Sequence, residues 1–252
     1  MKNLIKVCIA AFILIYSVSC REVGPSTSTF TFATTFELED TEAHSYLVDS
    51  LMYLPEFSME EISYFFSRSL EINSGYEGGF KISTKKGVEN ADDPNAIFTS
   101  AGSSAGALDS KYYLGYLRTG IMPDYDIKFD LSSYSSGSCM VVGCYINNSE
   151  YTKRLYDAGE IKSGDFLKVT MEFFKNGSFL GSWSKYLVDG INKLEPEVVT
   201  DWYPWDVAKE TKEKSVVYND VDAVRFIVET SPGKLKPCFC IDNFTVRADI
   251  VY

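Results

Sequence analysis

Residues 102–106 form a Gly-x-Ser-x-Gly motif, the pattern that surrounds the nucleophilic serine of many hydrolases. Such a serine needs a strand before the motif, a helix after it and a histidine later in the chain. The flanking segments have the composition of strands and turns, and the chain's one histidine, His44, precedes Ser104. We therefore interpret 102–106 as a turn of small residues and assign no catalytic residue.

Carboxylate pairs could hydrolyse a glycosidic bond, because one acid protonates the leaving oxygen while the other acts as a base or nucleophile. The chain has 35 acidic residues, so chance pairs are numerous. Asp189, Asp201 and Asp206 lie near tryptophans in the sequence. Nothing fixes the separation of any pair, so solvation of the surface is the favoured role of these acids. A glycan-acting hydrolase is kept as an alternative function.

Aromatic side chains offer flat apolar faces that suit a sugar or a large planar ligand. The candidates are Trp202 and Tyr203, together with Trp183 upstream. Tyr76 stands in a glycine-rich turn, where it is harder to bury. Because neighbouring residues of a strand point to opposite faces, packing into the core is the favoured role for any single ring.

Four cysteines follow the N-terminal apolar segment: Cys139, Cys144, Cys238 and Cys240. Cys238 and Cys240 share one face of a strand, and Cys139 and Cys144 fall on opposite faces of theirs, so neither local pair suits disulfide geometry. A cross-strand disulfide and buried free thiols both stay open. Tetrahedral zinc is disfavoured, because the sequence lacks paired Cys-x-x-Cys motifs and has a single histidine.

The elements that must position these side chains are mostly strands, as the alternation of apolar residues indicates. The predicted strands are 30–36, 69–73, 79–83, 96–100, 112–116, 124–131, 139–146, 166–174, 179–186, 224–228 and 238–246. The clearest feature is the hairpin around Asn176-Gly177, a pair that supplies the positive φ angles of a tight turn. Short helices are expected at 59–66, with Ser58 as N-cap, and at 149–157. Many short strands with little helix predict an all-β fold, a two-sheet antiparallel β-sandwich of jelly-roll type with short helical insertions.

The first 29 residues are predicted to direct export. Residues 1–19 carry two lysines and then an apolar run, which indicates a signal peptide. Cys20 follows small residues as in a lipobox, so we expect its thiol to be acylated and residues 20–29 to form a tether. Residues 30–252 then form one domain. No later apolar run approaches the roughly 20 residues that span a bilayer, so the lipid is the expected membrane contact.

The charge disfavours one class of partner. The chain has 24 basic and 35 acidic residues, which gives a formal charge of −11. A surface of this sign repels a phosphate backbone. We therefore expect no nucleic-acid partner.

Several short segments, taken in order, resemble the exported Bacteroidetes proteins of the family called domain of unknown function 4465. The matching segments are Phe36-Glu37, Gly78-Gly79-Phe80 with Ser83, 113–116, 143–149 with Tyr151, 164–170, 186–189, 202–207 and 239–243. The chain departs from the family pattern at 39–73, where the connection is longer, and at 82–90, where Lys85-Lys86-Gly87 replaces a loop of small residues.

The resemblance implies a jelly-roll β-sandwich, similar to carbohydrate-binding modules, on a lipoprotein of the outer membrane and cell surface. It implies a non-enzymatic function, the capture of a corrinoid such as vitamin B12 or of a glycan for uptake through an outer-membrane transporter. In similar jelly rolls a first-strand Glu and a last-strand Asp share calcium, so the resemblance also implies a structural calcium ion held by Glu37 and Asp242. A structural or adhesive surface protein is a further alternative.

Overall fold

The computed structural model describes residues 26–34, 36, 50–53, 63–69, 76–83, 94–118, 124–213 and 218–251. The predicted signal peptide, the lipid-anchor residue Cys20, His44 and the calcium candidate Glu37 lie outside these residues. Within the described part of the chain, no helix is long and apolar enough to cross a membrane.

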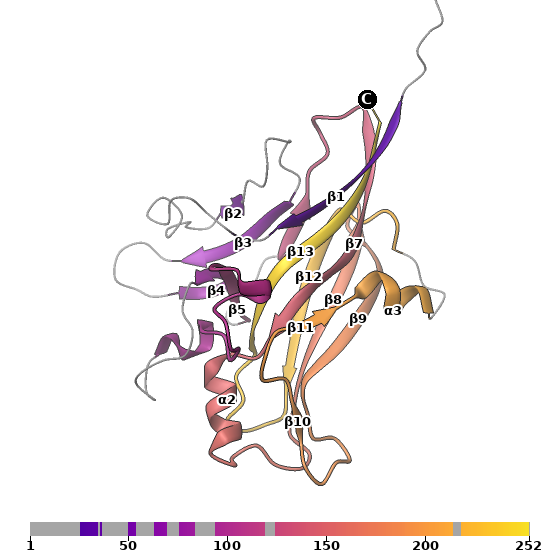
Figure 1. Ribbon diagram of the computed structural model, residues 1–252. Coiled ribbons are helices and arrows are strands. Elements are labelled where there is room, and N and C mark those ends of the chain that lie inside the picture. The colour runs from indigo at the N-terminus through magenta and orange to yellow at the C-terminus, as the bar shows by residue number, and fades with distance from the viewer. Residues whose placement is uncertain are drawn as a thin grey trace, which may run out of the picture.

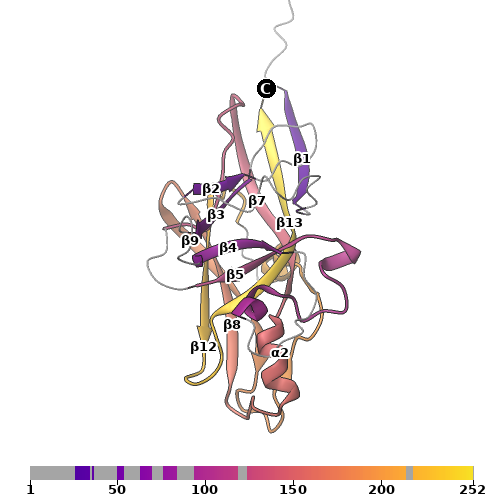
Figure 2. The ribbon, with the colours of Figure 1, turned by 90° about the vertical axis from the view of Figure 1, so that its left-hand side faces the viewer.

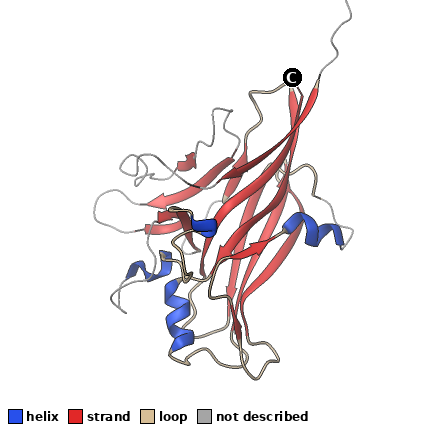
Figure 3. Ribbon diagram, viewed as in Figure 1, coloured by secondary structure: helices blue, strands red, loops and turns tan. Residues whose placement is uncertain are grey.

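Most of the described chain is β-strand. The strands are β1 (Thr27–Thr34), β2 (Ser50–Tyr53), β3 (Ser63–Ser69), β4 (Tyr76–Ser83), β5 (Tyr113–Leu117), β6 (Ile127–Phe129), β7 (Ser136–Asn147), β8 (Phe166–Lys175), β9 (Ser178–Asp189), β10 (Glu197–Val198), β11 (Tyr203–Trp205), β12 (Ala223–Thr230) and β13 (Cys238–Val251). The helical turns are η1 (Pro94–Phe98), η2 (Ala107–Asp109), α2 (Glu150–Asp157) and α3 (Val207–Glu213). Figure 3 shows α2 and α3 on the periphery of the strands.

The strands form two antiparallel layers that enclose the core, as Figures 1 and 2 show from two directions. One layer has the order β10-β9-β8-β12-β6, and the second has the order β5-β13-β7-β11. β3 and β4 connect the layers along one side, because β3 pairs with β6 and β4 pairs with β5. The predicted all-β sandwich is therefore confirmed.

The last strand, β13, changes its neighbour halfway along. Residues 238–241 pair with β5, whereas residues 244–251 pair with β1. The change occurs at Asp242 and Asn243, where the register with β7 shifts and Asn243 has a φ of 48°. Asn tolerates this left-handed conformation better than most residues with a Cβ. The two ends of the sandwich thus meet at a bulge.

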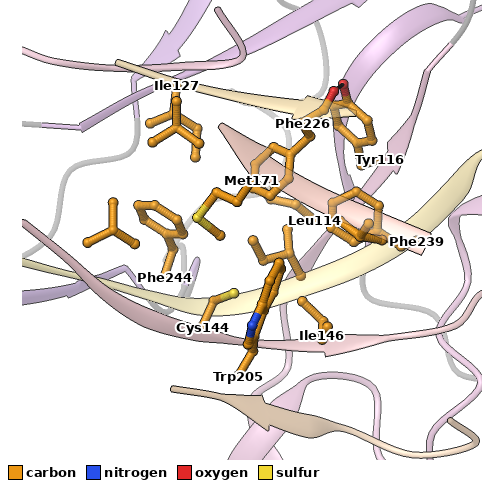
Figure 4. Packing of buried hydrophobic residues seen from close by; sticks show 14 of the residues in the cluster. Leu114, Tyr116, Ile127, Cys144, Ile146, Met171, Trp205, Phe226, Phe239 and Phe244 are labelled. Atoms are coloured by element: carbon orange, nitrogen blue, oxygen red, sulfur yellow. Dashed lines mark hydrogen bonds between the residues drawn. The ribbon is translucent and has the colours of Figure 1, made fainter. Parts of the chain in front are cut away.

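Aromatic rings fill much of the core between the layers. Phe226 packs against Phe80 and Phe239, with ring centroids 5.9 and 5.3 Å apart, and Phe65 packs edge-on against Phe244 at 5.7 Å. Figure 4 shows the Met171 side chain between Phe226 and Phe244. Such pairs contribute about 0.5–1.5 kcal/mol each beyond the area that they bury. The core therefore ties β3, β4, β12 and β13 together.

Two local predictions are correct because short-range signals decide them. The hairpin of β8 and β9 turns at Asn176 and Gly177, with φ angles of 48° and 77°. Helix α2 begins after Ser149, whose hydroxyl accepts a hydrogen bond from the Thr152 backbone N–H as an N-cap.

Other local predictions are wrong. Residues 59–66 were expected to be helical, but β3 begins at Ser63 and pairs with β6, because strand pairing of an aromatic run prevails over the capping signal. Residues 96–100 were expected to be a strand, but η1 occupies Pro94–Phe98, since proline presets the φ angle of a turn. β1 begins at Thr27, so the end of the expected tether 20–29 belongs to a strand.

Candidate functional site

Residues 94–112, here called the cover segment, lie across the outer face of the second layer. Tyr113, Cys240, Asp242 and Asn147 alternate with core residues on their strands and so point away from the core, yet each is fully buried. The cover segment buries them. It contacts the sheet closely, since a Cβ placed on Gly115 would lie 2.9 Å from Phe98.

Asp242 anchors the cover segment to β13. Its Oδ2 accepts hydrogen bonds from the Ala107 backbone N–H at 2.8 Å and from the Ser110 hydroxyl at 2.5 Å. Its Oδ1 accepts from the Asn243 backbone N–H at 2.7 Å. The bulge in β13 therefore presents a buried carboxylate that fixes the turn η2.

The expected calcium site pairs Asp242 with Glu37, which lies outside the described residues. Calcium takes six to eight oxygen ligands. The Asp242 carboxylate is instead surrounded by two N–H groups and a hydroxyl that donate to it, and among the described residues no cluster of three or more His, Cys, Asp and Glu side chains could hold a metal. This donor set does not fit calcium at Asp242, and the part of the predicted site that Glu37 would supply is not tested, because Glu37 lies outside the described residues.

We expect the melting temperature in excess calcium and in EGTA to agree within about 2 °C, which corresponds to less than about 1 kcal/mol for a domain of this size. Thermal unfolding followed by circular dichroism measures it. An increase of several degrees in calcium that disappears in Asp242→Asn would contradict this expectation and support the ion.

An open cavity of about 350 Å³ adjoins the cover segment on the same outer face. The cavity is lined by Ala33, Leu108, Val142, Gly143, Cys144, Tyr145, Pro204, Trp205, Asp206, Asn243 and Thr245. The lining is mostly apolar, with Asp206, Asn243 and Thr245 as polar members. Small-molecule sites typically have volumes of about 300–1,000 Å³ and this kind of lining.

Unfavourable backbone conformations gather around this cavity. Leu108 and Asp109 have φ angles of 52° and 63°, and Asn243, which also lines the cavity, has 48°. The Leu108 side chain is nevertheless 72% exposed. Residues held in such conformations cost about 1–3 kcal/mol each and cluster at binding sites. The bonds of Ala107 and Ser110 to Asp242, on either side of the strained pair, hold this conformation in place.

Two of the predicted ligand-binding rings lie elsewhere, where β9 faces β11 and α3. The Trp183 indole Nε1–H donates to Glu210 Oε2 at 2.6 Å, and the Tyr203 hydroxyl accepts from Lys185 Nζ at 2.8 Å. Both rings are half-buried and pack against the core. They are absent from the cavity lining, and their polar atoms bond within the protein.

The remaining aromatic candidates differ. Trp202 lies under the cover segment, where its ring packs edge-on against Tyr113 with centroids 5.5 Å apart. Tyr76 belongs to β4, and its side chain lies outside what the structure describes. Sequence reasoning did not select Leu108, Asn147 or Asn243 as site residues. The two asparagines at the end of the apolar strand β7, Asn147 and Asn148, could have indicated a polar site.

The Gly-x-Ser-x-Gly motif is part of the cover segment. η1 precedes it and η2 follows it, so it lacks the strand-to-helix context of a hydrolase. The Ser104 hydroxyl donates to the Gly106 carbonyl at 2.6 Å. Two of the acids near tryptophans also bond within the protein: Asp201 accepts from the Ser103 hydroxyl at 2.8 Å, and Asp206 accepts from the Lys209 backbone N–H at the start of α3.

The four cysteines are free and buried, which answers the question that the sequence left open. Burial raises the pKa of the Cys238 thiol to about 11 and that of Cys139 to about 12. A thiol must ionise to act as a nucleophile, so these side chains behave as small apolar residues at neutral pH.

Comparisons with known proteins agree with the fold. No family model and no curated protein matches the sequence. A solved structure, that of a DUF4465 family protein from Bacteroides caccae, is similar to this chain with a TM-score of 0.58 and 20% sequence identity. The match covers 86% of this chain and 98% of that one. At this identity the likeness shows a shared fold, and it supports the resemblance that the short segments indicated.

Proposed function

We propose that the protein binds a small ligand without transforming it, in the cavity between the cover segment and strands β1, β13, β7 and β11. The observation that carries the proposal is Leu108, an apolar side chain that stays 72% exposed at the cavity on a strained left-handed backbone. A ligand that covered Leu108 would remove this apolar surface from water.

The lining favours a neutral or cationic ligand with an apolar face. Asp206 borders the cavity, and the whole chain has a formal charge of −11, so an anion would be repelled. A sugar ring presents such a face. A corrinoid with its nucleotide loop is larger than the cavity and would insert only an edge. We propose that this capture takes place at the cell surface on a lipoprotein anchored through Cys20, and that the ligand passes to an outer-membrane transporter.

Filling the cavity should abolish binding. Ala33 lies half-buried on the edge strand β1 and lines the cavity, so Ala33→Trp would place an indole inside it. We expect affinity for the bound probe to fall at least tenfold, about 1.4 kcal/mol, whereas Ala33→Ser should bind like the unmodified protein. Calorimetric titration with cyanocobalamin and with neutral cello-, manno-, xylo- and malto-oligosaccharides measures this.

Three outcomes would overturn the proposal. The first is an unmodified protein that binds neither cyanocobalamin nor any oligosaccharide. The second is binding that survives Ala33→Trp unchanged, which would move the site away from the cavity. The third is release of new reducing ends from a bound oligosaccharide, which would favour the hydrolase alternative.

A further inference from the structure

We infer that the cavity continues beneath the cover segment as a polar subsite for the adjacent hydroxyl groups of a neutral carbohydrate. The residues that form this covered subsite are Asn147, Asp201 and Trp202. The inference rests on the proposed function, because it extends the same site and names its ligand class.

Unpartnered polar atoms gather at the covered subsite. Asn147 is fully buried, and neither its Nδ2 nor its Oδ1 has a hydrogen-bond partner among the described residues. The Trp202 indole Nε1 is also buried and unpartnered within that part of the chain. Native proteins pair the large majority of buried side-chain polar atoms. Three such atoms on two residues at one place are therefore free to bond a polar group from outside the chain, either a water molecule or a hydroxyl of a ligand.

These side chains converge on Gly102 of the cover segment. A Cβ placed on Gly102 would lie 2.8 Å from Asp201 Oδ1, 2.9 Å from Asn147 Nδ2 and 3.1 Å from Trp202 Cδ1. One point next to Gly102 is thus within bonding range of an amide and a carboxylate, beside an indole ring. A side chain at position 102 would displace these groups.

The covered subsite and the open cavity lie on the same face of the same strands. β7 contributes Tyr145 to the cavity and Asn147 to the subsite, and residues two apart on a strand share a face about 7 Å apart. β11 contributes Pro204 to the cavity, and Trp202 immediately precedes this strand. The covered subsite therefore lies next to the open cavity along strands β7 and β11.

The chemistry of the subsite matches a pair of neighbouring hydroxyls. Each hydroxyl donates one hydrogen bond and accepts others. The Asn147 amide both donates and accepts, the Trp202 indole donates, and the Asp201 carboxylate accepts. An apolar edge would leave the Asn147 amide and the Trp202 indole N–H unpaired, and an anion would meet the Asp201 carboxylate. A vicinal diol of a neutral sugar satisfies them together.

A ligand reaches the subsite when residues 101–106 of the cover segment lift. These six residues are only Ala, Gly and Ser. The Ser103 hydroxyl and backbone N–H bond to Asp201 at 2.8 and 3.2 Å, and the Ala101 N–H bonds to the Asn148 carbonyl at 3.0 Å. The bonds of Ser103 occupy the same carboxylate that a ligand would use, so closure and ligand compete for Asp201.

Three variants separate this inference from a merely structural role of the segment. Asn147→Leu keeps the side-chain size and removes the amide, and we expect it to weaken oligosaccharide binding at least tenfold while the melting temperature holds or rises. Gly102→Ala should weaken binding similarly, because its methyl group would displace the Asp201, Asn147 and Trp202 side chains that form the subsite. Ser103→Ala removes the competing hydroxyl and should strengthen binding severalfold. The probes are the same cello-, manno-, xylo- and malto-oligosaccharides, titrated by calorimetry.

A spectroscopic readout locates the contact independently of affinity. In the protein labelled with ¹⁵N-tryptophan, the indole N–H resonance of Trp202, assigned with Trp202→Phe, should shift on addition of the bound oligosaccharide, while that of Trp183 should stay in place. Trp183 serves as the control because its N–H already bonds to Glu210.

The inference and the proposed function fail differently. Oligosaccharide binding that Ala33→Trp abolishes but Asn147→Leu and Gly102→Ala leave unchanged would overturn the covered subsite and keep the cavity. Binding of cyanocobalamin and of no oligosaccharide, unaffected by Asn147→Leu, would likewise overturn the covered subsite and keep the cavity. Binding lost in Asn147→Leu and strengthened in Ser103→Ala supports the subsite. A protein that binds no probe overturns both.

Discussion

Replacing Asp242 with alanine is expected to lower the free energy of unfolding by about 3–5 kcal/mol, the range measured when one partner of a buried charged interaction is removed. The carboxylate is fully buried and accepts from Ala107, Ser110 and Asn243. A hydrogen bond to a charged group contributes about 1.5–3 kcal/mol. Of the three donors left behind, the Ala107 N–H would be buried without an acceptor, the Asn243 N–H would be part-buried, and the Ser110 hydroxyl would keep only the Tyr112 carbonyl. Urea denaturation of both proteins measures the difference.

Asp242→Asn is the matched control for this loss. The amide keeps the size and one acceptor oxygen, but its NH₂ would face donors, so we expect roughly half of the alanine effect. Amide hydrogen exchange should show that Ala107 loses protection first, because its N–H bonds directly to the carboxylate. A change below about 1 kcal/mol in Asp242→Ala would mean that Asp242 does not anchor the cover segment.

The second large effect is a pH dependence that arises from Asp126. This carboxylate is fully buried, and burial raises its pKa from 3.8 to about 6, although the Phe226 N–H, the Tyr116 hydroxyl and the Arg118 side chain oppose the increase. Because the folded pKa lies above the unfolded value, the folded state binds the proton more tightly. The resulting stabilisation is complete below about pH 4 and is lost as the pH rises through 6.

The pH-dependent contribution of Asp126 to the free energy of unfolding is expected to be about 3 kcal/mol, because its pKa shifts by about two units and each unit corresponds to about 1.36 kcal/mol. Asp126→Asn should remove this component, so the difference between the two proteins in unfolding free energy should change by that amount between about pH 7 and pH 4. Taking the difference cancels carboxylates common to both proteins, such as Asp130, whose pKa is lowered. Parallel pH profiles of the two proteins would contradict the assignment.

The architecture was largely predictable because strands are encoded by local alternation. On β8, Leu167, Val169, Met171 and Phe173 occupy every second position, and all four are fully buried. Asn176-Gly177 sets the turn with its own backbone preferences. The errors fell where a local signal competed with pairing to a distant strand, as at Ser63, where β3 pairs with β6 in place of the expected helix.

The candidate site was predicted only in fragments. Trp202 and Asp242 were selected by residue type, but the aromatic pattern equally selected Trp183, whose indole bonds to α3. Nothing in the sequence indicated that Leu108 would be exposed. Leu108 has a positive φ, and the hydrogen bonds of Ala107 and Ser110 to Asp242, more than a hundred residues away, hold this conformation. Residue type identifies side chains able to bind a ligand but not which of them are already bonded within the protein.

The sequence alone determined the all-β class, the hairpin at Asn176-Gly177 and the likeness in fold to DUF4465 proteins, since each depends on neighbouring residues or on the order of short segments. Only the tertiary structure decided that a small-residue turn covers β13 and β7 and that the Asn147 amide is buried beside Gly102. The physical reason is register. A slip of β13 by one residue along β7 would turn Asp242 into the core, and no local pattern states which residues of distant strands stand opposite each other.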